Sequence, residues 1–123
     1  MYLLETGKRT IELEWTTFAM KRYCDIKGVT LDKFTEAINS NDPYNVVYIV
    51  MAAMDYVRFK NGDIATTTEI EACDIVDECG GLFSMNKSLY DFFPYIVSKM
   101  VSPDLNVDGK KKAVKVKGQN QVG

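Results

Sequence analysis

Apolar and polar residues alternate near the start of the chain. Ile11, Leu13 and Trp15 are apolar and the residues between them are polar, a period of two that is typical of a half-buried strand. Residues 2–5 form a second apolar-rich run, and the short connection between the two runs contains Gly7. This arrangement favours a β-hairpin. Because an isolated hairpin is marginally stable in water, we expect its Ile11/Leu13/Trp15 face to pack on the rest of the chain.

Helical spacing replaces this alternation after residue 15. Thr16-Thr17 can cap a helix that runs to about Lys27, and Gly28 follows at a position where a left-handed residue commonly closes a helix. Thr30 caps a second, shorter helix, and the polar residues 39–41 end it. The sequence therefore predicts two helices between the hairpin and residue 41.

The third predicted helix is the most hydrophobic segment of the chain. Asp42-Pro43 opens it, with the acid as cap and proline at the first helical position, and Asn61-Gly62 ends it. Val46–Val50 alone has strand propensity, but the length from residue 43 to residue 60, without an internal breaker, favours a helix. Because residues 46–59 are apolar on nearly every face, we expect other elements to surround this helix.

Two further helices are expected before residue 102. Thr68 and Glu71 form a capping-box pattern that starts the fourth helix, and Gly80-Gly81 ends it. Pro94 lies within the fifth, so that we expect either a kink there or a start late enough to place Pro94 in the first turn. The fifth helix has the most regular apolar stripe, formed by Leu89, Phe92, Phe93, Ile96, Val97 and Met100.

These elements predict an α+β fold that is mostly α. An N-terminal β-hairpin packs on about five helices, with the hydrophobic third helix at the centre, and together they form one globular domain over residues 1–101. Residues 102–123 form a basic tail that we expect to be flexible. The alternating segment Ala113–Lys117 leaves an added edge strand open as an alternative.

Charge divides unevenly between these two parts. Residues 1–101 carry 10 basic and 15 acidic side chains, whereas residues 102–123 carry five lysines and two aspartates. The lysines either solubilise the tail, dock on an acidic partner or contact nucleic acid. Nucleic acid is the least favoured of these, because the tail has no aromatic residues for stacking and the acidic body repels phosphate. The tail lysines are Lys110, Lys111, Lys112, Lys115 and Lys117.

The residues that usually carry catalysis are scarce. The chain has no histidine, which removes the commonest general base and the commonest metal ligand. Cys24, Cys73 and Cys79 include no Cys-x-x-Cys pair, and the glycines match no phosphate-binding motif. The carboxylates of the fourth helix mostly lie opposite its apolar stripe, on the expected solvent side. We therefore expect a non-enzymatic protein without a metal or another cofactor.

Cysteine usage and hydropathy suggest a location. An odd number of cysteines and the absence of a basic leader at Met1–Glu5 favour a reducing, cytoplasmic compartment. The longest apolar run, Val46–Met54, is far too short to span a membrane. We expect no membrane partner.

The order of the elements resembles a known family. The chain is similar to the tail assembly chaperones of long-tailed bacteriophages and of prophages over roughly residues 5–97. The resemblance depends on the layout described above and on short phrases along it. These phrases are Trp15–Phe18, Gly28–Leu31, Asp42-Pro43, Gly62-Asp63, Thr68–Glu71, Asp74–Gly81 and Asp91–Phe93.

The resemblance implies a non-enzymatic role in the cytoplasm of the bacterial host. Such a chaperone keeps the tape-measure protein soluble, helps to recruit tail-tube subunits and is absent from the finished virion. In many of these phages a ribosomal frameshift near the end of the short form adds a second domain. Lys110–Lys112 is compatible with an A-rich slippery site, and the nucleotide sequence would test that hypothesis.

A chaperone of this kind needs exposed apolar surface within a charged rim. The partner-binding candidates are Leu89, Tyr90, Phe92, Phe93, Tyr95 and Ile96, together with the five tail lysines. Self-association through such a surface stays open, so that a homo-oligomer is a further expectation. Two alternative functions remain: a structural connector or completion protein that stays in the virion, and a small nucleic-acid-binding regulator that uses the basic tail.

Overall fold

The computed structural model describes residues 1–100. The chain divides into two compact units, Met1–Phe93 and Pro94–Gly123, and each is described by itself. The five candidate lysines of the tail and the alternating segment Ala113–Lys117 lie outside the described residues.

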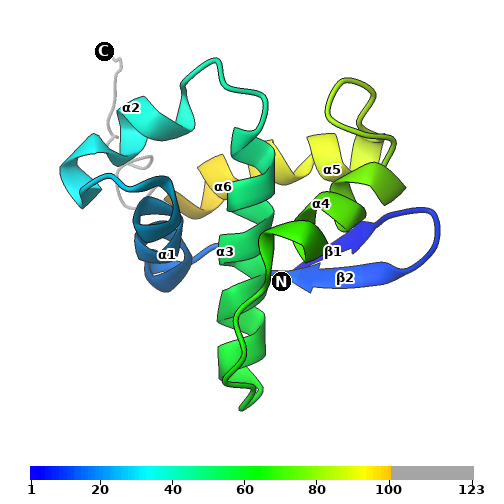
Figure 1. Cartoon of the computed structure of the whole chain (residues 1–123), viewed down its shortest axis with the longest axis horizontal. Coiled ribbons are helices and arrows are strands. Elements are labelled where there is room, and N and C mark those ends of the chain that lie inside the picture. The colour runs from blue at the N-terminus through cyan, green and yellow to red at the C-terminus, as the bar shows by residue number, and fades with distance from the viewer. Residues whose placement is uncertain (101–123) are drawn as a thin grey trace, which may run out of the picture. The chain divides into compact units, whose positions relative to one another are not determined.

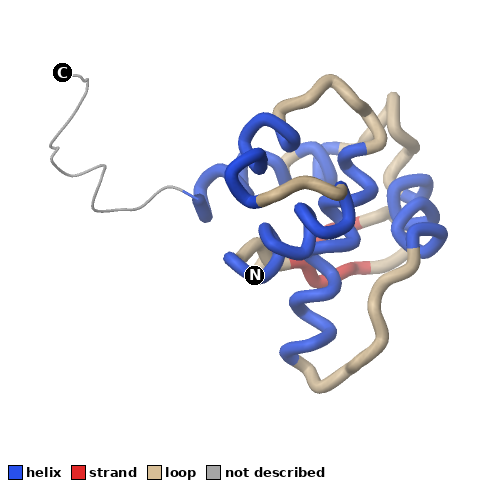
Figure 2. Tube along the Cα trace, turned by 60° about the vertical axis from the view of Figure 1, so that its left-hand side comes forward, coloured by secondary structure: helices blue, strands red, loops and turns tan. Residues whose placement is uncertain are grey.

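The first unit consists of an antiparallel hairpin followed by helices (Figure 1), and Figure 2 shows the two short strands among the helices that surround them. The predicted α+β, mostly helical fold with an N-terminal hairpin is therefore confirmed. The elements of the described residues are β1 (Tyr2–Glu5), β2 (Thr10–Leu13), α1 (Thr17–Lys27), the 3-10 turn η1 (Leu31–Lys33), α2 (Phe34–Ile38), α3 (Asn45–Lys60), α4 (Glu69–Glu78), α5 (Lys87–Tyr90) and α6 (Phe92–Met100). Most of α6 belongs to the second unit.

Alternation along the hairpin sorts its residues into a buried face and an exposed one. Leu4 and Leu13 are fully buried, whereas Leu3 is 54% exposed on the opposite face. Trp15 is buried just after β2, and Ile11 is half-buried. The predicted Ile11/Leu13/Trp15 face does pack on the helices, because it is the face that removes apolar surface from water.

The ends of α1 are set by the signals that the sequence carries. The Thr16 hydroxyl accepts a hydrogen bond from the backbone N–H of Ala19 at 3.2 Å. At the other end Gly28 has a φ of 81°, and its N–H donates to the Cys24 carbonyl at 2.8 Å. Glycine adopts this left-handed conformation without a steric cost, which explains why the helix ends there.

Helix α3 lies at the centre of the first unit. It is buried along most of its length, and α1, α4 and β2 all pack against it (Figure 1). Burial on nearly every side accounts for the apolar sequence of residues 46–57, and the helical form overrides the strand propensity of Val46–Val50. The predicted central helix is confirmed, although its helical hydrogen bonding begins at Asn45, two residues after Pro43.

Two buried polar contacts connect the elements around α3. Asp55 is fully buried and accepts hydrogen bonds from the Arg22 guanidinium and from the backbone N–H of Thr67, both at 2.7 Å. The Asn45 side chain accepts from the Tyr23 hydroxyl at 2.7 Å. Burial raises the pKa of Tyr23, so that the hydroxyl keeps its proton and remains a donor.

The predicted fifth helix is divided at Asp91. Helix α5 is capped by the Asn86 side chain, which accepts from the N–H of Leu89 at 2.9 Å, and α6 begins one residue after Asp91. Pro94 is the third residue of α6 and lies in its first turn, as the second sequence-based alternative predicted. The first turn has no intrahelical acceptor for its N–H groups, so a proline costs little there.

Candidate partner-binding surface

A groove runs between β2 and the C-terminal half of α3. Its volume is about 560 Å³, within the range of roughly 300 to 1,000 Å³ that ligand-binding clefts occupy. Most of its wall is apolar, with polar groups at the rim. It is lined by Leu3, Thr10, Ile11, Glu12, Met54, Val57 and Arg58.

The register of the hairpin gives this groove a polar backbone edge. The N–H of Thr6 donates to the Arg9 carbonyl at 3.0 Å next to the turn, and Leu4 lies opposite Ile11 in the ladder. In an antiparallel pair, hydrogen-bonded and non-bonded positions alternate along the strands. The N–H and C=O groups of Thr10 and Glu12 therefore point away from β1, along the side of the hairpin that borders the groove.

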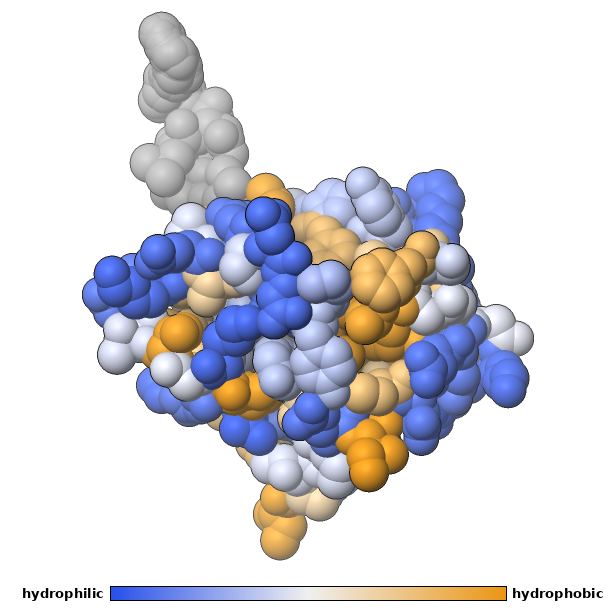
Figure 3. All heavy atoms as spheres, turned by 45° about the horizontal axis from the view of Figure 1, so that its top comes forward, coloured by the Kyte–Doolittle hydropathy of each residue, from blue (hydrophilic) through white to orange (hydrophobic). Residues whose placement is uncertain are grey.

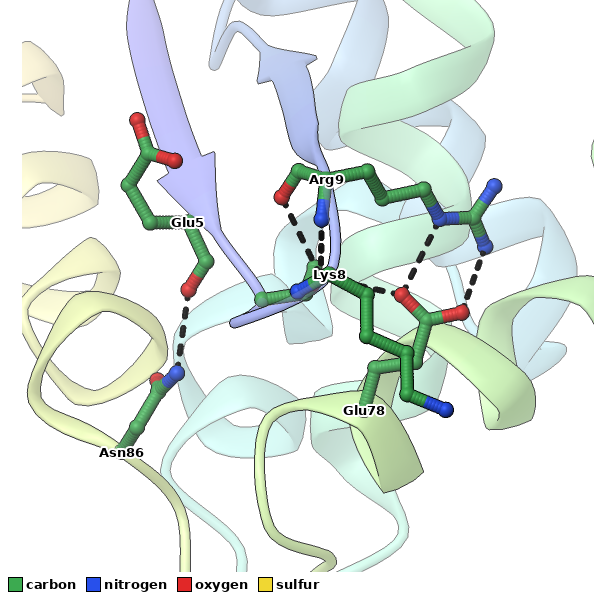
Figure 4. Close-up of polar contacts among 6 residues, drawn as sticks. Glu5, Lys8, Arg9, Glu78 and Asn86 are labelled. Carbon is green, nitrogen blue, oxygen red and sulfur yellow. Dashed lines mark hydrogen bonds and ion pairs between the residues drawn. The ribbon is translucent and has the colours of Figure 1, made fainter.

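The outer edge of β1 is covered instead. The N–H of Glu5 donates to the Ser88 hydroxyl at 2.8 Å. The Asn86 side chain donates to the Glu5 carbonyl at 3.0 Å, as Figure 4 shows. The Tyr2 hydroxyl also donates to the backbone carbonyl of Ser88. Helix α5 and the residue that caps it thus occupy one edge of β1, and β2 pairs with its other edge (Figure 1).

The turn of the hairpin is tied to the end of α4. Both oxygens of Glu78 accept hydrogen bonds from the Arg9 guanidinium, each at 3.0 Å (Figure 4), and the Thr6 hydroxyl donates to Glu78 at 2.9 Å. The Arg9 hydrogen bonds, and after them the bond from Thr6, hold the pKa of Glu78 below its ordinary value. This contact fixes the direction in which β2 leaves the turn.

Of the two charged residues that line the groove, Arg58 has an ion-pair partner in the described residues and Glu12 has none. Arg58 forms a two-pronged pair with Glu71 of α4, which raises the pKa of Arg58 and lowers that of Glu71 through the hydrogen bonds between them. Within residues 1–100, Glu12 has no ion-pair or hydrogen-bond partner for its carboxylate. The exposed face of the hairpin carries the carboxylates of Glu5 and Glu12, and the N-terminal ammonium is paired with Glu14 at 3.3 Å. The rim of the groove along β2 is therefore acidic.

No family model, curated protein or solved structure matches this chain.

A second apolar patch lies between α1 and the end of α3. The Phe18 ring is 6.3 Å from that of Tyr56 and 5.5 Å from that of Phe59, measured between centroids. These rings and Lys60 line a hollow of about 210 Å³, and Phe59 also borders a neighbouring hollow at which Ile64 is 93% exposed. Figure 3 shows apolar residues (orange) reaching one face in separate patches among hydrophilic ones (blue).

Some of the partner-binding candidates in the predicted fifth helix are buried and others are exposed. Leu89, Phe92 and Ile96 are buried, so little of each side chain is accessible. Tyr90 is 62% exposed, and Phe93 is half-exposed. Partner binding by these residues stays a prediction.

Tyr95 is the sixth apolar candidate. It is half-exposed, and the Lys99 ammonium lies 5.8 Å from the centre of its ring. A cation at this distance from an aromatic face is attracted by the ring quadrupole. Both residues lie in the second unit, where Tyr95 presents a partly accessible ring.

The cysteines of the described residues are protonated or lie beside a tyrosine, and none belongs to a metal-binding cluster. Burial raises the pKa of both Cys24 and Cys79, which keeps their thiols protonated, and Cys73 lies 3.2 Å from the Tyr44 hydroxyl. No group of three or more cysteine and carboxylate side chains within residues 1–100 lies close enough to hold a metal ion. Among the same residues, no helix combines the length and hydropathy required to cross a bilayer.

Sequence reasoning did not find the groove. Residues 10–13 suggested a strand with one buried face, but which outer edge of the hairpin is covered depends on Asn86 and Ser88, far along the chain. The available signal was the pair of acidic residues on the exposed face of the hairpin. That signal indicates a solvent-facing strand and does not distinguish an open edge from a covered one.

Proposed function

We propose that this protein is a tail assembly chaperone of a long-tailed bacteriophage or prophage. It binds and solubilises the tape-measure protein in the host cytoplasm and helps to recruit tail-tube subunits. The order of elements along residues 5–97 supports the family. The apolar groove between β2 and α3 is the observation that carries the protein-binding role.

Exposed apolar side chains elsewhere on the described surface add to this support. A protein that holds an aggregation-prone client needs apolar contact area, and it needs charged surroundings that keep the complex in solution. Large hydrophobic residues that are at least 40% exposed include Leu3, Phe18, Ile64, Phe83 and Tyr90. Acidic side chains, which outnumber basic ones in residues 1–100, supply the charged surroundings.

Co-expression with the tape-measure protein encoded in the same genome tests this function. The chain should increase the fraction of tape-measure protein that stays in the supernatant after centrifugation. Leu3→Ser removes an apolar side chain of the groove and should reduce the gain. Ile70→Ser is the matched control, because Ile70 is exposed on α4 and does not line the groove.

Tyr90→Ser examines the sequence-based candidate in the same assay. If Tyr90→Ser reduces the gain and Leu3→Ser does not, the client binds near α5 and not at the groove. No gain with both proteins well expressed would contradict the chaperone function. Recovery of the chain from purified virions would instead favour a structural connector or completion protein.

A further inference from the structure

The edge of β2 offers unpaired backbone groups beside an apolar wall. The N–H and C=O groups of Thr10 and Glu12 point away from β1, and within residues 1–100 no hydrogen bond to these groups is formed. An open strand edge is a template for another strand, because each backbone group there otherwise depends on water. Such an edge next to an apolar groove is the arrangement that strand-addition sites use.

The geometry of the groove defines what an added strand would present. Side chains alternate between the two faces of a sheet, so every second residue of the added strand would point toward α3. There it would meet Ile11, Met54 and Val57. These positions favour apolar residues, and β-branched ones in particular, because such residues pack well on a pleated surface.

The alternate residues of an added strand would lie beside the exposed face of the hairpin. Directly across the edge they would face Thr10 and Glu12, with the carboxylate of Glu5 one strand further away. An opposite charge across a strand pair is stabilising, and a like charge directly opposite is destabilising. Because the Glu12 carboxylate has no partner in the described residues and Arg58 is paired with Glu71, the charge left for the added strand to match is negative.

We propose that β2 binds an extended segment of a partner protein in which β-branched apolar residues alternate with basic ones. The segment adds a third strand to the hairpin, its apolar side chains fill the groove and its basic side chains face Glu12. This inference deepens the proposed function, on which it rests for the identity of the partner as a client in tail assembly.

A second copy of this chain fits the same edge less well. Pairing two β2 strands through Ile11 would place Thr10 of one copy opposite Glu12 of the other. The exposed face of the resulting sheet would then gather the Glu5 and Glu12 carboxylates of both copies. Like charges so close oppose each other, whereas a basic strand neutralises them.

Binding of a short synthetic peptide of alternating valine and lysine to the full chain tests the proposal. A titration followed by NMR should shift the amide signals of Thr10, Ile11 and Glu12 and those of Met54 and Val57 on α3. A peptide of alternating valine and glutamate should bind at least about tenfold more weakly at low salt, and added salt should reduce that difference.

Two substitutions at one position test the edge: Glu12→Lys keeps the backbone N–H and reverses the charge, whereas Glu12→Pro removes both the N–H and the carboxylate. Glu12→Pro removes an outward-facing N–H that β1 does not use, and proline is tolerated at such edge positions, so the hairpin should stay folded. It should weaken binding of the lysine peptide about tenfold or more. Glu12→Lys should also weaken it, whereas Glu36→Lys, the same charge change at an exposed site on α2, should leave binding unchanged.

Several results would overturn the inference. Equal binding of the two peptides, no binding of either, or unchanged binding by a folded Glu12→Pro variant would each do so. A dimer of the chain that Glu12→Pro converts to a monomer would show that a second copy occupies the edge. If Glu12→Pro still solubilises the tape-measure protein fully, the inference fails while the proposed function stands.

Discussion

The two strands of the hairpin differ in the fate of their outer edges. The edge of β1 is covered, because Ser88 and Asn86 bind the N–H and C=O of Glu5. The edge of β2 borders an apolar groove, and the backbone groups of Thr10 and Glu12 are left for solvent or for a partner. Two strands of equal length in one hairpin therefore differ at their outer edges: that of β1 is covered by side chains from residues 86 and 88, and that of β2 is open.

Removing the buried charge of α3 should have the largest effect, because α3 packs against α1, α4 and β2. Asp55→Ala deprives the Thr67 N–H of its acceptor and leaves Arg22 without its carboxylate. We expect the free energy of unfolding to fall by about 3 kcal/mol or more. Urea unfolding followed by circular dichroism measures this change.

Asp25→Ala is the matched control for that substitution. Asp25 pairs with Lys21 on the exposed side of α1, at 2.5 Å, so its removal should cost only about 0.3–0.5 kcal/mol. Similar losses in the two variants would contradict the structural role assigned to Asp55.

Removing the side chain that covers β1 should expose a backbone N–H of its edge to solvent, as the N–H groups on the edge of β2 are. Ser88→Ala removes the acceptor for the Glu5 N–H, and we expect a loss of about 1 kcal/mol of stability. Amide hydrogen exchange should accelerate at Glu5 and remain unchanged at Thr10 and Glu12. Unchanged exchange at Glu5 would show that the β1 edge is protected by something other than Ser88.

Acid should loosen the turn that orients β2. The pKa of Glu78 is lowered from its ordinary value of 4.5, so the stabilising contribution of this carboxylate is present above pH 4.5 and is lost as the pH falls through the lower folded value. The same sign applies to Glu71 beside Arg58. Thermal unfolding between pH 7 and pH 3 should show this loss.

Arg9→Gln separates the contribution of Glu78 to the pH dependence of stability from that of Glu71. It should reduce the fall in stability with acid, because the pKa of Glu78 would then lie closer to 4.5 in the folded protein. Arg58→Gln should produce the corresponding change for Glu71. A pH dependence unaltered by Arg9→Gln would show that the Glu78 pair contributes nothing measurable.

Charge reversal on the open edge should have the smallest effect on stability. Glu12 has no carboxylate partner in the described residues, so Glu12→Lys should change the free energy of unfolding by no more than about 0.5 kcal/mol. The same variant should weaken binding of the valine–lysine peptide. A loss of both stability and binding would indicate that Glu12 supports the hairpin itself.

The sequence predicts well what depends on neighbouring residues. The hairpin follows from alternation over residues 10–15, and the ends of α1 and the start of α4 follow from capping residues at Thr16, Gly28 and Thr68. Each of these signals involves residues only a few positions apart, so it can be recognised in the sequence. The late start of α6 is one of two alternatives that the sequence leaves open. Proline is compatible both with a kink inside a longer helix and with the first turn of a shorter one.

The open edge and the buried ion pair could not be read from the sequence. Asp55 has the same local pattern as an exposed acid on a helix, and only packing brings Arg22 and Thr67 to it. The covered edge of β1 depends on Asn86 and Ser88, which lie 81 and 83 positions after Glu5. Periodicity also placed Leu89 and Phe92 among the partner-binding candidates, since an apolar stripe has the same spacing whether it is buried or exposed.

The position of Asn86 late in the chain affects the hairpin during synthesis. The Asn86 side chain caps α5 and also holds the Glu5 carbonyl, 81 residues earlier in the chain. A ribosome therefore exposes the completed hairpin long before the segment that covers β1 has emerged. During that interval both edges are open, and each new molecule passes through a stage at which two strand edges, and not one, are available to neighbouring chains.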